Sequence, residues 1–198
     1  MIARLSKRMA SFFVCNEVIK SEDEEVYEYG LQLLLSTVFN GIIALILAIV
    51  SGTALQCVCY LAVFVLLRKS AGGFHAKTHF GCCCILATVL SLFIMFIKFI
   101  PNEVYGIVAA IAATFSVVII LAFAPLEHEN KPISTKDKIR LRKISIIYVF
   151  LLALLVFMLF TAKLKMIMIC VALGMFTASS SMLVAVIEKK IRPIHLGT

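Results

Sequence analysis

The sequence contains one long run without a formal charge, YGLQLLLSTVFNGIIALILAIVSGTALQCVCYLAVFVLL, which extends from Tyr29 to Leu67. These 39 residues are interrupted near the middle by Ser51-Gly52-Thr53. A helix rises about 1.5 Å per residue, so the run would measure about 58 Å, close to two crossings of a bilayer core of about 30 Å. The run therefore predicts two membrane helices joined by a tight turn, the second of them short.

Four more uncharged runs of 19 to 23 residues follow along the chain. Each is long enough to cross a bilayer once. The pattern predicts an all-α polytopic membrane protein with about six transmembrane helices, in a single integral membrane domain that covers residues 1–198. We place the spans near residues 29–50, 53–67, 80–100, 104–124, 144–162 and 166–187.

The composition excludes several other classes of protein. Of the 198 residues, 62% are hydrophobic and 15% are charged, whereas a soluble domain is about 45–50% apolar. Disordered chains have low hydrophobicity. The seven cysteines are an odd number, and most lie in apolar stretches, so they do not indicate a disulfide scaffold.

The distribution of Lys and Arg predicts the orientation. The formal net charge is +8, and most of the cationic residues fall in alternate connections, which places them on one side of the membrane. Since cytoplasmic loops are enriched in Lys and Arg, this side is expected to be the cytoplasm. Lys163 and Lys165, on the opposite side, are a mild exception. We therefore expect a multi-pass membrane protein with both termini cytoplasmic and no nucleic-acid partner.

The first 20 residues have a different pattern. Their large apolar side chains share one helical face, with Arg4, Lys7 and Arg8 turned away. This pattern is typical of an amphipathic helix that lies in the membrane interface. The segment has no uninterrupted apolar core followed by a cleavage site, so we expect it to be retained rather than removed as a signal peptide. A new helix is expected to start at Ser21 and to continue into the first span.

Candidate chemistry is concentrated between the second and third spans, in RKSAGGFHAKTHFGCCC, from Arg68 to Cys84. The second span, if it ends at Leu67, is only about 22 Å long. Either the bilayer thins around this span, or the following loop dips into the membrane to complete the crossing. Gly72-Gly73 would allow a sharp turn there. Non-helical backbone is tolerated at that depth only where protein or water covers it.

His75 and Cys82 could form a catalytic dyad. A cysteine nucleophile needs a base to form its thiolate, and histidine is the usual partner. On one straight helix the two side chains would be about 10 Å apart, so the loop must fold back. Cys82 should lie near the N-terminus of the third span, where the helix dipole favours a thiolate.

Other interpretations of this segment remain open. The cysteines could be ordinary packing residues, with the histidines as polar loop groups. The cysteines on the cytoplasmic side could also be palmitoylated. Alternatively, His75, His79, Cys82 and Cys83 could bind zinc or copper(I). In that case the protein would be a non-enzymatic membrane transporter or a metal-binding membrane protein.

Two motifs resemble those of a known family. AGGFHAKTHFGC, residues 71–82, resembles the signature of the accessory gene regulator B (AgrB) family, which are membrane-embedded cysteine endopeptidases of Gram-positive bacteria. APLEHENKPI, residues 124–133, resembles the Ala-Pro and Lys-Pro pair that follows the fourth span in that family. The size and the six spans fit as well, so the resemblance covers nearly the whole chain.

The resemblance implies a thiol protease of quorum sensing that lies in the bacterial cell membrane and needs no cofactor or metal. Cys82 matches the family's nucleophile and His75 its base, whereas His79 matches no role. The substrate would be a small amphipathic AgrD-type precursor peptide, cut at the C-terminal side of its future ring. Capture of the acyl-enzyme by a side chain of the peptide would give a thiolactone or lactone autoinducer. Membrane lipid is a further expected partner, and a homodimer is left open.

Two details of the site follow from charge. No Asp or Glu lies between Glu28 and Glu103, which favours a dyad over a triad. The family's precursors have an acidic C-terminal part, which basic residues on the cytoplasmic side could hold. The candidates for this contact are Arg68, Lys69, Lys131, Lys138 and Arg140. The alternative is that these cations only orient the chain and bind anionic lipid.

Overall fold

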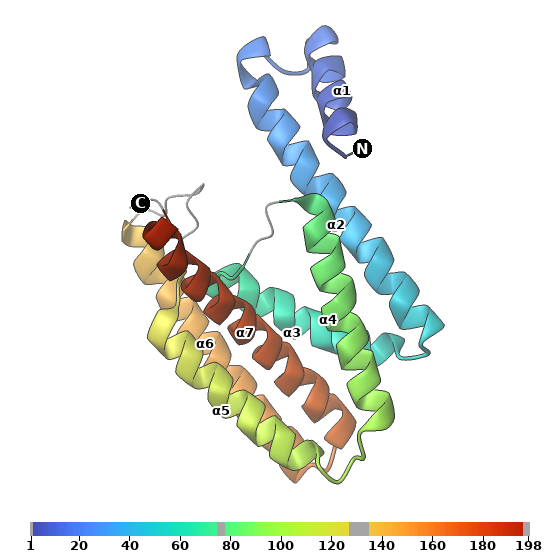
Figure 1. Ribbon diagram of the computed structural model, residues 1–198, viewed down its shortest axis with the longest axis vertical. Coiled ribbons are helices and arrows are strands. Elements are labelled where there is room, and N and C mark those ends of the chain that lie inside the picture. The colour runs from blue at the N-terminus through green and yellow to red at the C-terminus, as the bar shows by residue number, and fades with distance from the viewer. Residues whose placement is uncertain (1, 75–77, 127–134, 196–198) are drawn as a thin grey trace. The chain divides into compact units, whose positions relative to one another are not determined.

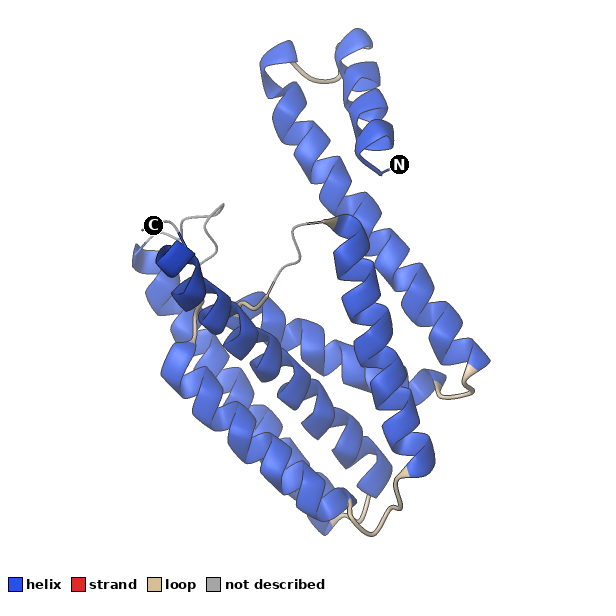
Figure 2. Cartoon of the chain, in the orientation of Figure 1, coloured by secondary structure: helices blue, strands red, loops and turns tan. Residues whose placement is uncertain are grey.

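The structure is a computed structural model that describes residues 2–74, 78–126 and 135–195. The described chain is helical throughout, apart from its turns and connections (Figures 1 and 2). The elements are α1 (Ile2–Cys15), η1 (Ser21–Asp23), α2 (Glu24–Val50), α3 (Ala54–Ala71), α4 (His79–Phe99), α5 (Tyr105–Phe123), α6 (Thr135–Thr161) and α7 (Lys165–His195).

Six of these helices, α2 to α7, are long and apolar enough to cross a membrane. The predicted class, an all-α polytopic membrane protein with six spans, is confirmed. Several helices extend beyond the apolar runs that predicted them, because a charged residue ends such a run without ending the helix. Thus α3 continues through Arg68 and Lys69 to Ala71, and α6 begins at Thr135.

The chain divides into two compact units. The first comprises residues 1–50 and 76–90, and the second comprises residues 51–75 and 91–198. The prediction of one integral membrane domain stays a prediction.

In the first unit, α1 packs against α2. Ser6 and Ala10 are the buried side chains of α1, and small residues at this contact let the two helices approach closely. The Ser11 hydroxyl of α1 also donates a hydrogen bond of 2.6 Å to the Glu24 carboxylate in the first turn of α2. Leu5 and Phe12, from the apolar face that the sequence predicted, remain exposed, as a helix that lies against lipid requires.

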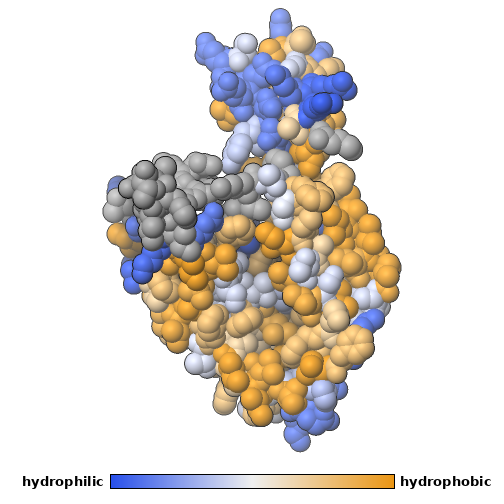
Figure 3. All heavy atoms as spheres, viewed as in Figure 1, coloured by the Kyte–Doolittle hydropathy of each residue, from blue (hydrophilic) through white to orange (hydrophobic). Residues whose placement is uncertain are grey.

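In the second unit, α7 packs against α3, α5 and α6. Of its apolar stretch, 56% is buried, compared with 17 to 33% for the other five candidate spans. Large apolar side chains on the outer faces of the spans are exposed, and Figure 3 shows them covering much of the visible surface of the helices. Such a surface suits lipid rather than water.

Close approach of α7 to α3 depends on Gly174. A Cβ atom at this position would lie 2.8 Å from the Tyr60 carbonyl oxygen and 3.0 Å from the Val63 Cβ. The Tyr60 hydroxyl donates a hydrogen bond of 2.8 Å to the Thr177 hydroxyl, one turn further along α7. Small residues and interhelical hydrogen bonds are the usual means by which membrane helices associate.

This packing predicts opposite effects for two glycine substitutions. Gly174→Ala should lower the stability by roughly 1–3 kcal/mol, because its methyl group meets backbone and a Cβ. Gly30→Ala in α2 is the control: no neighbouring atom lies within 4 Å of the point that its Cβ would occupy, so it should be neutral or raise the stability by about 0.5–1 kcal/mol. Thermal unfolding of the purified protein in detergent measures both. Equal shifts for the two variants would contradict this account of the α3–α7 contact.

Candidate functional site

The segment that leads to His75 begins where α3 ends. The helix stops at Gly72, whose backbone has φ +84° and whose N–H donates to the Arg68 carbonyl oxygen at 3.1 Å. A Cβ at Gly72 would lie 2.7 Å from the backbone oxygen of Leu126. Both the left-handed backbone and the close approach of another chain segment therefore require glycine here.

The residues after α3 are non-helical but held by hydrogen bonds. The Leu126 N–H donates to the Ala71 carbonyl oxygen at 2.9 Å, and the Phe74 N–H donates to the Ser181 carbonyl oxygen of α7 at 3.0 Å. A Cβ at Gly73 would lie 2.7 Å from the Ser181 hydroxyl oxygen. Protein thus covers this stretch and supplies partners for its backbone, as irregular backbone at a membrane span requires.

Arg68, a candidate for substrate binding, lies at this same turn. Its guanidinium donates a hydrogen bond to the Phe74 carbonyl oxygen and lies over the Phe64 ring, 5.4 Å from the ring centroid. Arg68 therefore braces the segment immediately before His75. Lys69 is exposed at the end of α3. Contact of either residue with substrate stays a prediction.

His75 and Lys131 lie outside the described residues, and the side chain of His79 is not described. The His75–Cys82 dyad and the role of Lys131 therefore stay predictions. Among the described side chains, no three potential metal ligands gather. Because the metal alternative depends on His75 and His79, it stays open.

Cys82 lies in the first turn of α4. Thr78 precedes the helix and caps it: the Thr78 hydroxyl accepts a hydrogen bond from the Gly81 N–H at 3.0 Å, and the Thr78 carbonyl accepts one from the Cys82 N–H at 3.1 Å. A threonine at this position is a favourable N-cap. The Cys82 thiol therefore lies at the positive end of the helix dipole.

Sequence reasoning missed the residue that contacts this thiol. The side-chain Nδ2 of Asn40, in α2, lies 3.5 Å from the Cys82 sulfur, and both residues belong to the first unit. The signal was present, since a side-chain amide in an apolar span is costly and commonly functional. Among the described residues, Cys82 is the one of the three consecutive cysteines with such a partner; Cys83 is half-buried and Cys84 is exposed.

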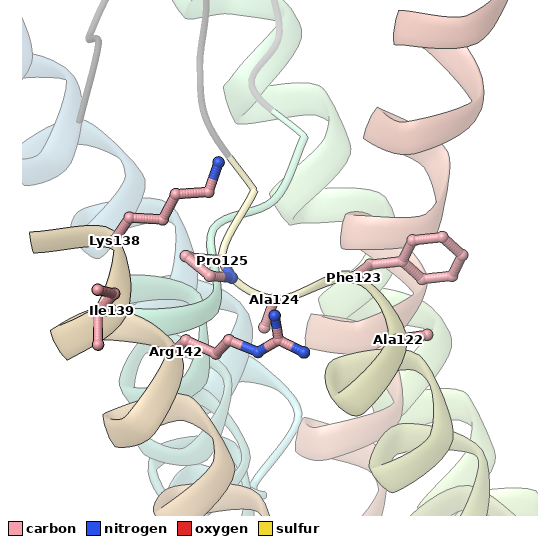
Figure 4. A pocket seen from close by; sticks show the side chains of 7 residues that line it. All are labelled: Ala122, Phe123, Ala124, Pro125, Lys138, Ile139 and Arg142. Atoms are coloured by element: carbon pink, nitrogen blue, oxygen red, sulfur yellow. The ribbon is translucent and has the colours of Figure 1, made fainter. Parts of the chain in front are cut away.

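The remaining basic candidates lie at the start of α6, in the second unit. Lys138 and Arg140 are both exposed. Lys138, Ile139 and Arg142 line one wall of an open pocket of about 460 Å³, opposite residues 122–125 at the end of α5. Figure 4 shows Arg142 reaching toward Ala124, with Lys138 beside Pro125. The pocket thus has a cationic wall beside the Ala124-Pro125 pair.

The comparisons with known proteins decide the family. The model of the family described as accessory gene regulator B matches residues 6–185. This chain belongs to the AgrB family. An AgrB-like protein 2 of Clostridium perfringens (strain 13 / Type A) is 31% identical over 162 residues, which are 76% of this chain and 75% of that protein.

Two further AgrB-like proteins match over 188 and 132 residues. One from Clostridium perfringens (strain SM101 / Type A) is 28% identical over 188 residues, or 88% of this chain and 87% of that protein. One from Listeria innocua is 30% identical over 132 residues, or 65% and 63% of the two chains. No solved structure gives a significant match. Membership of the AgrB family and the six candidate spans together identify a multi-pass membrane protein.

The glycine pair predicts a selective rescue. Gly73→Ala should lower the thermal stability of this chain, and Ser181→Ala should restore much of the loss, because the clash is with the Ser181 hydroxyl and the next atom, its Cβ, is 3.8 Å away. Ser181→Ala should not rescue Gly72→Ala, because the new methyl group would meet the backbone oxygen of Leu126 and the φ angle of Gly72 is positive. The measurement is a double-mutant cycle on thermal stability. Failure of Ser181→Ala to rescue Gly73→Ala, or rescue of Gly72→Ala as well, would contradict this geometry.

Proposed function

We propose that this protein is a membrane-embedded cysteine endopeptidase that cleaves an AgrD-type precursor peptide through an acyl-enzyme on Cys82. The proposal places both termini in the cytoplasm. The observation that carries it is the setting of Cys82: the thiol lies at the capped start of a span helix, and a side-chain amide lies 3.5 Å from its sulfur. Membership of the AgrB family supports the substrate class.

In the proposed reaction, His75 accepts the Cys82 thiol proton and the thiolate attacks the scissile carbonyl carbon. The carbonyl π electrons move to the oxygen. When they return, the C–N bond breaks and the amine of the C-terminal fragment leaves with the proton from His75. The N-terminal fragment remains on Cys82 as a thioester.

Ring closure then follows within the bound peptide. A thiol or hydroxyl of the N-terminal fragment attacks the thioester carbonyl, and its proton passes to His75. The Cys82 sulfur leaves and recovers that proton, so the enzyme is regenerated and a thiolactone or lactone is released. This outcome requires that water be kept from the thioester. The exposed apolar surface of the span helices supports this, because such a surface favours a lipid environment.

The basic end of the second unit suits the acidic C-terminal part of the precursor. The ends of α3 and α5 are joined by the Leu126–Ala71 hydrogen bond, and α7 joins them through Ser181 and Phe74. Arg68, Lys69 and the cations of the α6 pocket belong to this end. We therefore propose that these cations attract the acidic tail of the precursor while the bond is cut.

The nucleophile assignment predicts a clear difference among the three cysteines. Cys82→Ser should abolish cleavage of the precursor, whereas Cys83→Ser and Cys84→Ser should retain most of it, because on a helix their side chains point about 100° and 200° away from that of Cys82. Cleavage is measured by mass spectrometry with the protein in proteoliposomes. Retained cleavage in Cys82→Ser, or loss in Cys84→Ser alone, would refute the assignment.

A second prediction concerns four cationic residues at the start of α6. Replacement of Lys136, Lys138, Arg140 and Arg142 by Gln should raise the apparent KM for an acidic-tailed precursor by roughly tenfold, equivalent to about 1.4 kcal/mol. It should change the KM for a neutral-tailed precursor little. The matched control is Lys163→Gln with Lys165→Gln, at the connection between α6 and α7.

The effect should weaken with added salt, because screening acts over about 8 Å at physiological ionic strength. Equal losses for the two precursors, with topology shown intact by cysteine accessibility, would mean that these cations only orient the chain and bind lipid.

A further inference from the structure

Asn40 lies on the inward face of α2. The buried residues of this helix are Ser36, Ala44 and Ala48, and Asn40 falls between the first two at the same four-residue spacing. Residues four apart share a helix face. The amide therefore points the same way as the buried small residues, whereas its neighbour Phe39 is exposed.

The Asn40 amide is only partly satisfied. Its Nδ2 is within hydrogen-bond distance of the Cys82 sulfur, at 3.5 Å, but its Oδ1 is buried without a hydrogen-bond partner among the described residues. A buried polar atom without a partner is destabilising, and an apolar side chain of similar size would avoid that cost. Local packing alone thus gives no reason for asparagine here, and residues of this kind are often found at functional sites.

A hydrogen bond from the Asn40 amide would favour the thiolate form of Cys82 over the thiol form. A neutral thiol sulfur is a weak acceptor, whereas a thiolate accepts a charge-assisted hydrogen bond that is roughly twice as strong as a neutral one. The amide is uncharged, so it gives this stabilisation without the cost of placing a second ion in the span. The Asn40 contact also distinguishes Cys82 from Cys83 and Cys84. From the sequence, Cys82 could be distinguished only by its spacing from His75.

We propose that Asn40 is a catalytic residue whose side-chain N–H donates to the Cys82 thiolate and holds it ready for attack. The proposal rests on the proposed function, in which Cys82 is the nucleophile. In the acylation step the sulfur forms its bond to the carbonyl carbon and its negative charge passes to the carbonyl oxygen. The hydrogen bond from Asn40 is therefore strongest before attack, and it acts by raising the thiolate population.

The expected size of the effect is modest. A hydrogen bond of this kind should raise the thiolate population by roughly 10- to 100-fold. Stabilised thiolates are less nucleophilic, with a Brønsted coefficient of about 0.4–0.5. The net gain in reactivity near neutral pH should therefore be about 3- to 10-fold.

The experiment measures the thiolate directly, without a precursor. The rate of iodoacetamide labelling at Cys82 is followed by mass spectrometry at pH 7 and pH 9.5, in a background with Cys83→Ser and Cys84→Ser. Asn40→Leu, which keeps the volume, is compared with Asn40→Ala. The control is Thr37→Val, because the Thr37 hydroxyl bonds to the Leu33 carbonyl of its own helix at 2.8 Å.

Both Asn40 variants should label about 3- to 10-fold more slowly than the parent at pH 7 and at least as fast at pH 9.5. Asn40→Leu should be as stable as the parent or more stable, because it removes the unpaired Oδ1. Thr37→Val should label like the parent at both pH values.

Three results would overturn the role of Asn40. The first is unchanged labelling at pH 7 in both variants. The second is an equal slowing at both pH values, which would indicate altered access of iodoacetamide to Cys82. The third is failure of both variants to fold, which would make Asn40 a packing residue. If labelling is unchanged while Cys82→Ser is inactive, the proposed function stands and only the role of Asn40 fails. If Cys82→Ser still cleaves the precursor, both fail.

Discussion

Backbone groups that leave a helix within a membrane protein need hydrogen-bond partners from the protein itself, and this constraint determines the structure around Gly72 and Gly73. The chain leaves α3 through a left-handed glycine and bonds at once to Leu126 and Ser181. These partners come from the end of α5 and from α7. The packing of the second unit therefore places the residues immediately before His75, and glycine is needed because the partner segments approach so closely.

In the first unit, two uncharged features surround the Cys82 thiol. The Asn40 amide of α2 contacts the Cys82 sulfur, and α4 begins at a threonine cap one turn before the thiol. A neutral donor and a helix terminus can stabilise a thiolate where a buried Lys or Arg would be costly. Neither feature depends on a carboxylate, in agreement with the absence of Asp and Glu between Glu28 and Glu103.

The sequence predicted the fold class and the number of spans well, because uncharged runs and bilayer thickness are closely linked. It predicted helix ends less well, since α3 and α6 continue through Lys and Arg. It also singled out the segment with the glycines and Cys82 as a candidate site, which stays a prediction. It could not reveal Asn40 or Ser181 as partners, because those contacts join residues 42 and 107 positions apart. The charge of Arg68 suggested a contact with substrate, and nothing in the sequence indicated that its guanidinium donates a hydrogen bond to the Phe74 carbonyl oxygen.

The central claim is that Cys82 carries the acyl group during precursor cleavage. The most direct test uses an AgrD-type precursor whose ring-forming Cys or Ser is replaced by Ala, so that ring closure cannot remove the acyl group. After rapid acid quenching, mass spectrometry of the peptide that contains Cys82 should show the N-terminal fragment attached to Cys82 as a thioester that hydroxylamine releases. Attachment of the fragment to Cys83 or Cys84, or complete cleavage by a Cys82→Ser variant, would contradict the account.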